Sequence, residues 1–282
     1  MPYSQTNELL GYPPDARLLI LNTDDFGMCH SINQAVIHTI REGAATSCTL
    51  MVPCPWGLHG LHLLRENPDI PFGVHLTAVS EAVCYRWGPL TPRERAPSLV
   101  DEAGYFYNEE RIPEFLARVN LVELELEFQA QIEAVLAAGL KPTHVDSHCG
   151  THTRREDIFD MTVGLAREYG LAMRISEPPL IEKIKRLGLP ACDYDILDSY
   201  RVETRDKPAY YFRKLRDLPP GLTEWGVHPA LVTDELKAIG DSWPIRQADF
   251  AFLMSPETRE VIRQEGIIVL NYKPLQVLWQ TK

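Results

Sequence analysis

Seven short apolar runs recur along this chain of 282 residues, and stretches with helical periodicity separate them. Each run has the length and aliphatic content of a buried strand, so we predict strands at these positions. Parallel neighbours need a crossover, which helices supply, so the alternation predicts an α/β protein with a mainly parallel sheet. The predicted strands are Leu18–Asn22, Thr46–Val52, Phe72–Leu76, Thr143–Ser147, Ala172–Ile175, Leu222–Val227 and Gly266–Leu270. The predicted helices are Ile32–Glu42, Gly57–Glu66, Leu121–Ala138, Glu156–Tyr169, Pro179–Leu187 and Ser255–Gln264.

The longest predicted helix, Leu121–Ala138, shows how these patterns are interpreted. Its apolar residues recur at spacings of four and three, which indicates one buried face. By the same count, Glu123, Glu127 and Glu133 fall on the opposite side. Gly139 ends the helix in the ordinary way and leads into the next predicted strand.

Two segments depart from the alternation. Residues 1–15 are polar and contain proline, so we predict an N-terminal extension followed by a single domain over residues 16–282. Between about residues 78 and 120 the periodicity fails. An irregular insertion of this length is usually a functional lid or a disordered loop. Its aromatic residues favour a lid: Tyr85, Trp87, Tyr105, Phe106 and Tyr107.

Composition narrows the possible partners. The formal net charge of −11 argues against nucleic acid and anionic membranes, because both repel an acidic protein. The six cysteines have no CxxC pair and no regular spacing, which is typical of reduced thiols. There is no leader pattern, and no apolar stretch reaches about 18 residues, the length of a membrane-spanning helix. We predict a cytoplasmic protein that acts on a small or neutral molecule.

The first predicted strand is followed by two adjacent carboxylates, Asp24 and Asp25, and then by Gly27. The end of a buried parallel strand is where α/β proteins keep their chemistry. Adjacent ionised acids in a half-buried place repel each other, and a bound cation or a shared proton is the usual relief. The alternative is that one of them caps the helix that begins near Ser31.

Histidines follow two further strands. His75 lies between Val74 and Leu76, where a histidine alone is more often a packed core residue. The segment Thr143–His152, however, holds three histidines and an aspartate. In a parallel barrel the carboxyl ends of the strands converge on one mouth, so Asp25, His75 and His148 can reach a common point. One carboxylate and two imidazoles are a recognised ligand set for a catalytic divalent ion.

These residues belong to a longer pattern of six segments. They are Asn22–Gly27, His30–Val36, Gly43–Ser47, Gly73–Thr77, Pro142–His148 and Val227–Pro229. In these segments the chain resembles the YdjC-like carbohydrate deacetylases, which remove acetyl groups from N-acetylated sugars such as chitooligosaccharides. The resemblance spans about residues 17–272, and the segments occur in the family's order and at similar separations.

The resemblance implies a TIM-like (β/α) barrel with fewer than eight strands, and a homodimer is plausible. It also implies one divalent ion, magnesium or zinc with manganese or nickel as possibilities, held by Asp25, His75 and His148. Asp24 would be the general base. The chain departs from the family after His148, where Cys149-Gly150-Thr151 replaces further histidines.

A mechanistic hypothesis follows for the remaining residues. Asp24 would accept a proton from the attacking water, and His228 would protonate the leaving amine. The alternative for His228 is a histidine packed at a strand end. We predict that His144 and Asp146 orient His148 or its loop. Predicted substrate contacts are His152, Arg174, Tyr105 and Trp87.

Arg174 and a late helix-like stretch have alternative interpretations. Arg174 could bind Asp24 or form a surface ion pair. For Arg246 and Asp249, a solvated surface is favoured over a place in the substrate cleft.

Two other functions stay open. The same metal site could act on a phosphoester, an ester or a non-sugar amide, since one scaffold hosts many chemistries. Four arginines near the lid leave this comparison unsettled: Arg86, Arg93, Arg95 and Arg111. The second alternative is a non-catalytic sugar-binding barrel. Such a protein would tolerate loss of Asp24 or His228, and both are present.

Overall fold

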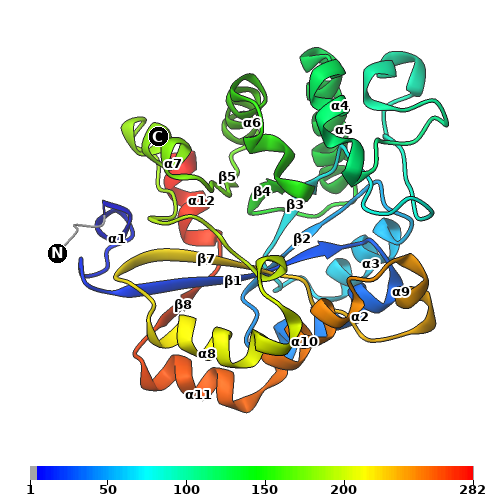
Figure 1. The fold of residues 1–282 in the computed structure, drawn as a ribbon. Coiled ribbons are helices and arrows are strands. Elements are labelled where there is room, and N and C mark those ends of the chain that lie inside the picture. The colour runs from blue at the N-terminus through cyan, green and yellow to red at the C-terminus, as the bar shows by residue number, and fades with distance from the viewer. Residues whose placement is uncertain (1–4, 282) are drawn as a thin grey trace.

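A curved, parallel sheet forms the centre of the computed structural model, which describes residues 5–281 (Figure 1). Seven strands form a continuous path in the order β5-β4-β3-β2-β1-β7-β6, and β8 pairs with the first part of β1. All of these pairings are parallel. Within the described residues no pairing joins β5 to β6, so the barrel is open there. The strands are β1 (Arg17–Phe26), β2 (Ser47–Leu50), β3 (Phe72–Leu76), β4 (His144–Ser147), β5 (Ala172–Met173), β6 (Leu197–Asp198), β7 (Gly221–Val227) and β8 (Ile268–Leu270).

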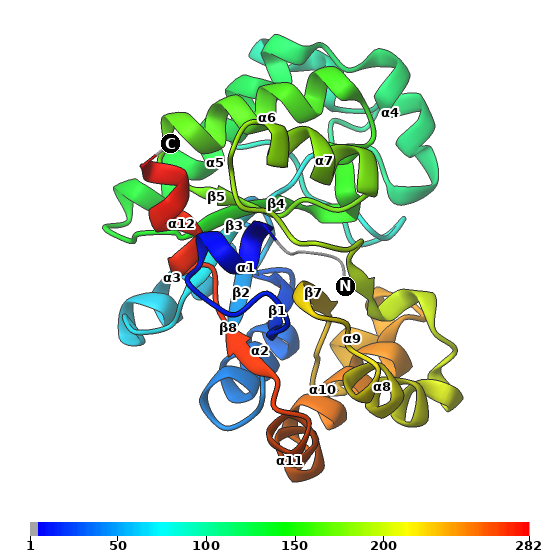
Figure 2. The ribbon, with the colours of Figure 1, turned by 90° about the vertical axis from the view of Figure 1, so that its left-hand side faces the viewer.

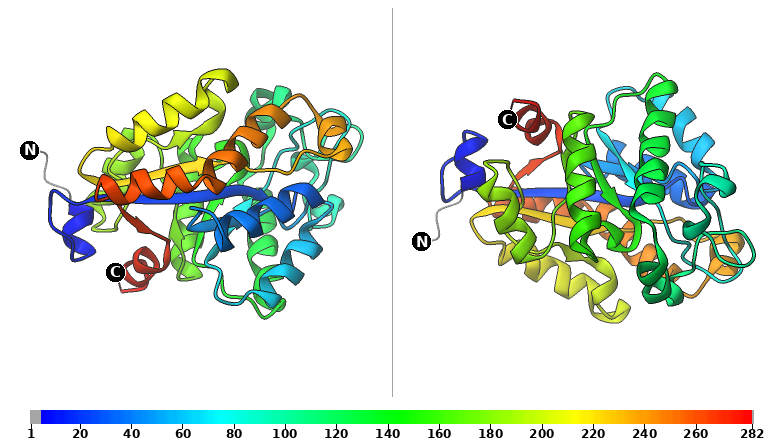
Figure 3. Two further views of the ribbon diagram at one scale, coloured as in Figure 1. Left: turned by 90° about the horizontal axis from the view of Figure 1, so that it is seen from below. Right: turned by 90° about the horizontal axis from the view of Figure 1, so that it is seen from above.

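Helices surround this sheet. Figure 2, viewed from the end at which β1 and β7 begin, shows them around the strands, and Figure 3 shows β1 running through the middle of the molecule. The α-helices are α1 (Gln5–Leu9), α2 (His30–Arg41), α3 (Gly57–Glu66), α4 (Ile112–Arg118), α5 (Leu121–Ala137), α6 (Glu156–Glu168), α7 (Pro178–Arg186), α8 (Lys207–Arg216), α9 (Asp234–Ile239), α10 (Trp243–Met254), α11 (Pro256–Gln264) and α12 (Lys273–Gln280).

The predicted incomplete α/β barrel is confirmed, and each predicted strand and helix has a counterpart. The prediction missed β6, which has only two residues, and six helices. Four of the missed helices, α4, α8, α10 and α12, carry proline in their first two positions. Proline there starts a helix rather than breaking it, because the missing N–H would have no intrahelical partner.

The inside of the barrel is polar. Thr49 on β2 donates a hydrogen bond to Asp146 on β4, although β3 lies between these strands. Arg174, which follows β5, binds Glu224 on β7 across the opening of the sheet. Such contacts between strands that are not neighbours require side chains that fill the interior. Apolar packing instead joins the sheet to its helices, and two buried clusters form this core.

The first described residues contact a distant part of the chain. Thr6 on α1 is buried and donates a hydrogen bond to the Ala191 carbonyl at 2.6 Å. Asn7 donates to the carbonyls of Pro13 and Ala16. Residues 1–4 of the extension lie outside the described part of the chain.

The insertion at residues 78–120 is held by α5 (Figure 1). Glu127 accepts hydrogen bonds from the backbone N–H groups of Leu90 and Thr91, and Gln131 binds both backbone groups of Thr77. The placement of Glu127 on the side away from the buried face was therefore wrong, because its side chain is completely buried. Burial raises the pKa of Glu127, and the four-residue step to Gln131 adds a further hydrogen bond.

Within residues 5–281, no helix combines the length and the apolar character needed to cross a membrane.

Candidate active site

An irregularity in β1 brings the two adjacent carboxylates together. The pairing of β1 with β2 shifts register between Thr23 and Phe26, and Asp25 has a φ of 66°. In a regular strand neighbouring side chains point to opposite faces, whereas a bulge redirects one of them. Asp24 and Asp25 consequently line the same cavity. The pair was expected after the strand, but it lies within it, because β1 extends to Phe26.

Gly27 supports this bend. It has a φ of 102°, and a Cβ there would lie 2.8 Å from the Met51 carbonyl oxygen. Its N–H donates to Asn33 Oδ1 at 2.6 Å, and Met28 N–H donates to the Asp25 carbonyl. A residue with a side chain would have to displace this backbone.

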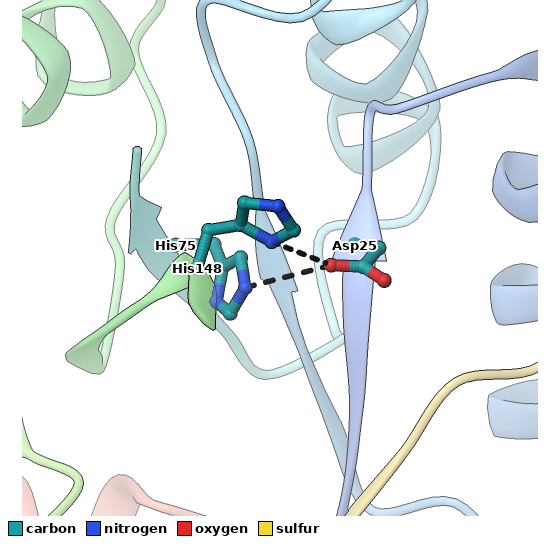
Figure 4. Close-up of side chains that lie close together, drawn as sticks. All are labelled: Asp25, His75 and His148. Atoms are coloured by element: carbon teal, nitrogen blue, oxygen red, sulfur yellow. Dashed lines mark ion pairs between the residues drawn. The ribbon is translucent and has the colours of Figure 1, made fainter. Parts of the chain in front are cut away.

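Asp25, His75 and His148 meet at the carboxyl ends of β1, β3 and β4. Figure 4 shows both imidazoles directed at one oxygen of Asp25: Oδ1 lies 3.6 Å from His75 Nε2 and 3.3 Å from His148 Nδ1. All three side chains are buried, and their potential ligand atoms lie within 4.8 Å of one another. The buried Nε2 of His148 has no hydrogen-bond partner among the described residues.

This group fits a divalent ion. Two ligands bound tetrahedrally at about 2.1 Å lie roughly 3.4 Å apart, which is close to the two distances measured from Asp25. Carboxylate and imidazole are ligands that zinc and related ions accept. Burial raises the pKa of Asp25, but the Arg246 guanidinium and His148 outweigh this effect and hold it well below its usual range. Asp25 is therefore ionised, as a ligand must be.

A second group of potential ligands, Asp24, His75 and Asp146, already contains a cation. Arg174 donates to both oxygens of Asp24 at 2.7 and 2.8 Å, and its Nη1 lies 2.6 Å from Asp146 Oδ2. Its Nε donates to Glu224 at 2.8 Å. Arg174 is buried, so the surface ion pair considered for it is wrong, and the interpretation that it binds Asp24 is correct. Burial raises the pKa of Asp24, but Arg174 lowers it by more, so that the pKa lies below its usual value.

Arg246 binds the other oxygen of Asp25. Its Nη2 lies 2.7 Å from Asp25 Oδ2 and 3.1 Å from a Glu81 oxygen. The solvated surface favoured for Arg246 is wrong, since its side chain is 1% exposed and lines the cavity. Sequence patterns offered no signal for this pairing, because Arg246 belongs to a late helix-like stretch that lies far from β1 in the chain.

His228 follows β7 and reaches the cavity from the side opposite His75 and His148. Its Nε2 lies 3.8 Å from Asp24 Oδ2, and its Nδ1 lies 2.8 Å from Ser199 Oγ. The side chain is 14% exposed. Its position in the cavity is that of a group able to reach a bound molecule.

The cavity has a volume of about 460 Å³. Its floor is formed by Asp24, Asp25, His75, His148 and His228 together with the two buried arginines. Further lining residues include Glu109, Cys149, Arg154, Glu177, Tyr200 and Arg201. Both signs of charge and one tyrosine therefore face whatever binds there.

Comparison with known proteins identifies the family. A family model described as YdjC-like protein matches residues 18–264. This chain belongs to the YdjC-like family. A relative from Enterococcus faecalis, named carbohydrate deacetylase, is 31% identical, covering 91% of this chain and 97% of the relative. A carbohydrate deacetylase from Thermus thermophilus is 35% identical, covering 88% and 90%. A chitooligosaccharide deacetylase from Yersinia enterocolitica is 29% identical, covering 91% and 98%.

Solved structures agree with this YdjC-like assignment. A crystal structure of an Enterococcus faecalis protein, described as a candidate cellobiose-phosphate cleavage protein, matches with a TM-score of 0.78 at 30% identity. It covers 92% of this chain and 99% of that one. A lactam utilization protein from Thermus thermophilus matches with a TM-score of 0.51 at 14% identity, which shows likeness of fold alone.

At this YdjC-like site, Asp146 and His144 make contacts that differ from those expected. Asp146 binds His75, with Oδ1 2.7 Å from Nδ1, rather than His148. The ring of His75 is thereby held with Nε2 toward Asp25. His144 forms no such hydrogen bond to His75 or His148. Its ring instead stacks on Tyr272, with 3.7 Å between centroids. It also fills the space beside Gly73, where a Cβ would lie 2.6 Å from the ring. Burial lowers the pKa of His144 to about 3.

Of the four predicted substrate contacts, two line the cavity but have other partners. Arg174 is engaged by three carboxylates, as described above. The Nε2–H of His152 donates to the Arg174 carbonyl at 3.0 Å, and its Nδ1 lies 2.5 Å from Ser147 Oγ. It joins the ends of β4 and β5, and burial lowers its pKa to about 4.

The two aromatic candidates from the insertion, Trp87 and Tyr105, differ in exposure. Trp87 is 3% exposed, and its ring centroid lies 6.1 Å from that of His148. Tyr105 is 41% exposed, lies near the guanidinium groups of Arg86 and Arg93, and is not among the residues that line the cavity. Neither aromatic residue is among those that line the cavity, although the ring of Trp87 lies beside the candidate ligand His148.

Proposed function

We propose that this protein is a carbohydrate deacetylase that hydrolyses the acetamido group of N-acetylated sugars of the chitooligosaccharide type. The observation that carries the proposal is one cavity holding a candidate metal-binding group and, beside it, Asp24 and His228. Relatives that span almost the whole chain are named carbohydrate deacetylases and chitooligosaccharide deacetylase.

Asp25, His75 and His148 would hold one divalent ion. Their distances and their burial support this assignment. When bound there, such an ion supplies Lewis acidity toward the amide carbonyl and lowers the pKa of water. Magnesium and zinc are the first candidates, with manganese and nickel next.

Two residues of the chain would move protons. Asp24, held by Arg174 at the edge of the cavity, accepts a proton from the attacking water. His228 Nε2 faces the same space from 3.8 Å away and donates a proton to the amine nitrogen as the C–N bond breaks. The proposed base and acid therefore lie side by side and face the same space, so water addition and amine expulsion can occur without rearrangement of the site.

Acetate release from N-acetylglucosamine oligomers tests the proposal. The purified protein is treated with a chelator, and zinc, magnesium, manganese or nickel is restored separately. We expect release that depends on the metal and falls about a thousandfold in Asp24→Asn. The matched control is Asp234→Asn on α9, outside the cavity lining. If the protein binds metal stoichiometrically yet releases no acetate, the sugar assignment fails, and phosphoesters, esters and other amides are assayed next.

We further propose a cytoplasmic location and a homodimer. The location is supported by the six cysteines, all free in the structure, which suit a reducing compartment. The homodimer rests on family resemblance. Cell fractionation and light scattering with size-exclusion chromatography test the two proposals.

A further inference from the structure

A buried polar cluster holds the backbone of His228. Asp249 on α10 accepts a hydrogen bond from the His228 N–H through Oδ2 at 3.0 Å. Its Oδ1 accepts from Lys207 Nζ at 2.8 Å and from Tyr211 OH at 2.6 Å, both on α8. All three side chains are fully buried, and none lines the cavity. We call Asp249, Lys207 and Tyr211 the Asp249 cluster.

The ring of His228 is held from a second direction. Ser199, which follows β6 directly and is fully buried, lies with Oγ 2.8 Å from Nδ1. The adjacent Tyr200 meets the ring edge-on, with 4.6 Å between centroids. These two contacts leave Nε2 as the ring nitrogen directed toward Asp24 and the cavity. Backbone and ring are therefore fixed independently.

Stability is a weak reason for placing Lys207 here. It lies in the first turn of α8, where the helix dipole disfavours a cation, and burial disfavours its charge again. Burial lowers the pKa of Lys207, although Asp249 opposes this effect. A buried ion pair is seldom more stabilising than apolar residues of the same size. The ion pair does fix the orientation of the Asp249 carboxylate, because Asp249 cannot turn away from His228 without leaving Lys207 unpaired.

We propose that the Asp249 cluster and Ser199 are positioning residues that hold the Nε2–H of His228 toward the nitrogen of the scissile amide. The inference rests on the proposed deacetylase function. In the step that they serve, the C–N bond of the hydrated amide breaks and its electron pair stays on nitrogen, which takes the proton from Nε2. The proton that Asp24 takes from water then replaces the one lost from His228 Nε2, 3.8 Å away, so amide and water become acetic acid and amine with no further reactant.

The leaving group separates positioning from general structural support. An N-acetyl sugar expels an amine, which needs a proton, whereas 4-nitrophenyl acetate expels a phenolate, which leaves without one. In Ser199→Ala and Tyr211→Phe we expect kcat for N-acetylglucosamine oligomers to fall about tenfold or more, with KM little changed. We expect kcat for 4-nitrophenyl acetate to fall less than about twofold, because proton donation contributes little there.

Matched variants control for damage to the fold. Tyr210→Phe changes the neighbouring tyrosine of α8 and should leave both reactions unchanged. His228→Ala sets the upper limit, since positioning cannot contribute more than the imidazole itself. If Ser199→Ala does not fold, the double variant Lys207→Met/Asp249→Asn removes the ion pair without leaving an unpaired buried charge, and the same selective loss is expected.

Equal losses on both substrates in folded variants would overturn the inference, as would no loss on either. A selective loss in Tyr210→Phe as large as that in Tyr211→Phe would also overturn it. Wild-type protein that hydrolyses the ester but releases no acetate from any N-acetyl sugar would instead remove the proposed function, and the inference with it.

Discussion

Asp24 and Asp25 are neighbours in the chain, yet the two sides of the barrel interior surround them differently. Toward β3 and β4, one oxygen of Asp25 faces two imidazoles at 3.3 and 3.6 Å. Toward β5 and β7, both oxygens of Asp24 bind the single guanidinium of Arg174. One side thus has three candidate ligands around Asp25 Oδ1, with Arg246 on the other oxygen of Asp25, whereas on the other side Arg174 occupies both oxygens of Asp24. The neighbouring strands, not the aspartates, assign a candidate ligand to one carboxylate and a candidate base to the other.

The largest expected effect tests directly whether Asp24 and Asp25 have different roles. Asp25→Asn should lose both bound metal and activity, whereas Asp24→Asn should keep the metal and lose activity by about a thousandfold. Metal content of the purified variants, measured by plasma mass spectrometry, is compared with acetate release. Loss of metal from Asp24→Asn to the same extent would show that the two carboxylates are not distinct.

Removal of the internal cation should cost stability. Arg174→Met leaves three buried carboxylates, those of Asp24, Asp146 and Glu224, without their shared partner. The free energy of unfolding should fall by about 3–5 kcal/mol, as for other broken buried ion pairs. Urea unfolding measures it, with Arg154→Met at the cavity rim as the control. A change below about 1 kcal/mol would mean that the carboxylates take up protons instead.

The polar interior should also make stability depend on pH. Burial holds the folded-state pKa of His144 at about 3, against an ordinary value near 6.5. Between these values the unfolded chain binds a proton that the folded protein excludes, so stability falls as pH falls below about 6.5. The loss approaches about 1.4 kcal/mol per pH unit. His144→Gln should flatten the unfolding curve between about pH 6 and 4, and the exposed His62→Gln should not.

The smallest effect is expected in the insertion. Tyr105→Ser removes an exposed ring outside the cavity lining, so kcat/KM should change by less than about twofold. Trp87→Leu, by contrast, removes the ring beside His148 and should reduce kcat/KM by about tenfold. Steady-state kinetics of acetate release measure both. Equal effects would mean that the insertion acts on the site as a whole.

Local patterns were sufficient for the sheet and for the three candidate ligands. Strand ends in a parallel barrel converge by topology, so Asp25, His75 and His148 could be brought together from their places in the chain. Their roles as ligands stay predictions. The bulge at Asp25 could not be predicted, because it depends on the contact of Gly27 with the next strand.

The partners of the buried charged residues come from distant parts of the chain and could not be predicted. Arg174 was considered because it follows a strand, but its three carboxylate partners come from β1, β4 and β7. Arg246 was assigned to a solvated surface because a helix-like pattern carries no information on its partner, Asp25 on β1. Glu127 was misplaced because periodicity distinguishes apolar from polar faces and carries no information on a carboxylate that binds two backbone N–H groups.

The opening between β5 and β6 has a consequence for the circumference of the barrel. In a closed barrel the last gap is spanned by main-chain hydrogen bonds, which any residue except proline can form. Here a side chain contributes to the span, through the contact of Arg174 with Glu224 at 2.8 Å. A lysine at position 174 would keep the charge but lacks the planar fork that reaches three carboxylates at once. One guanidinium therefore links the two edges of the open barrel and also fixes the orientation of Asp24.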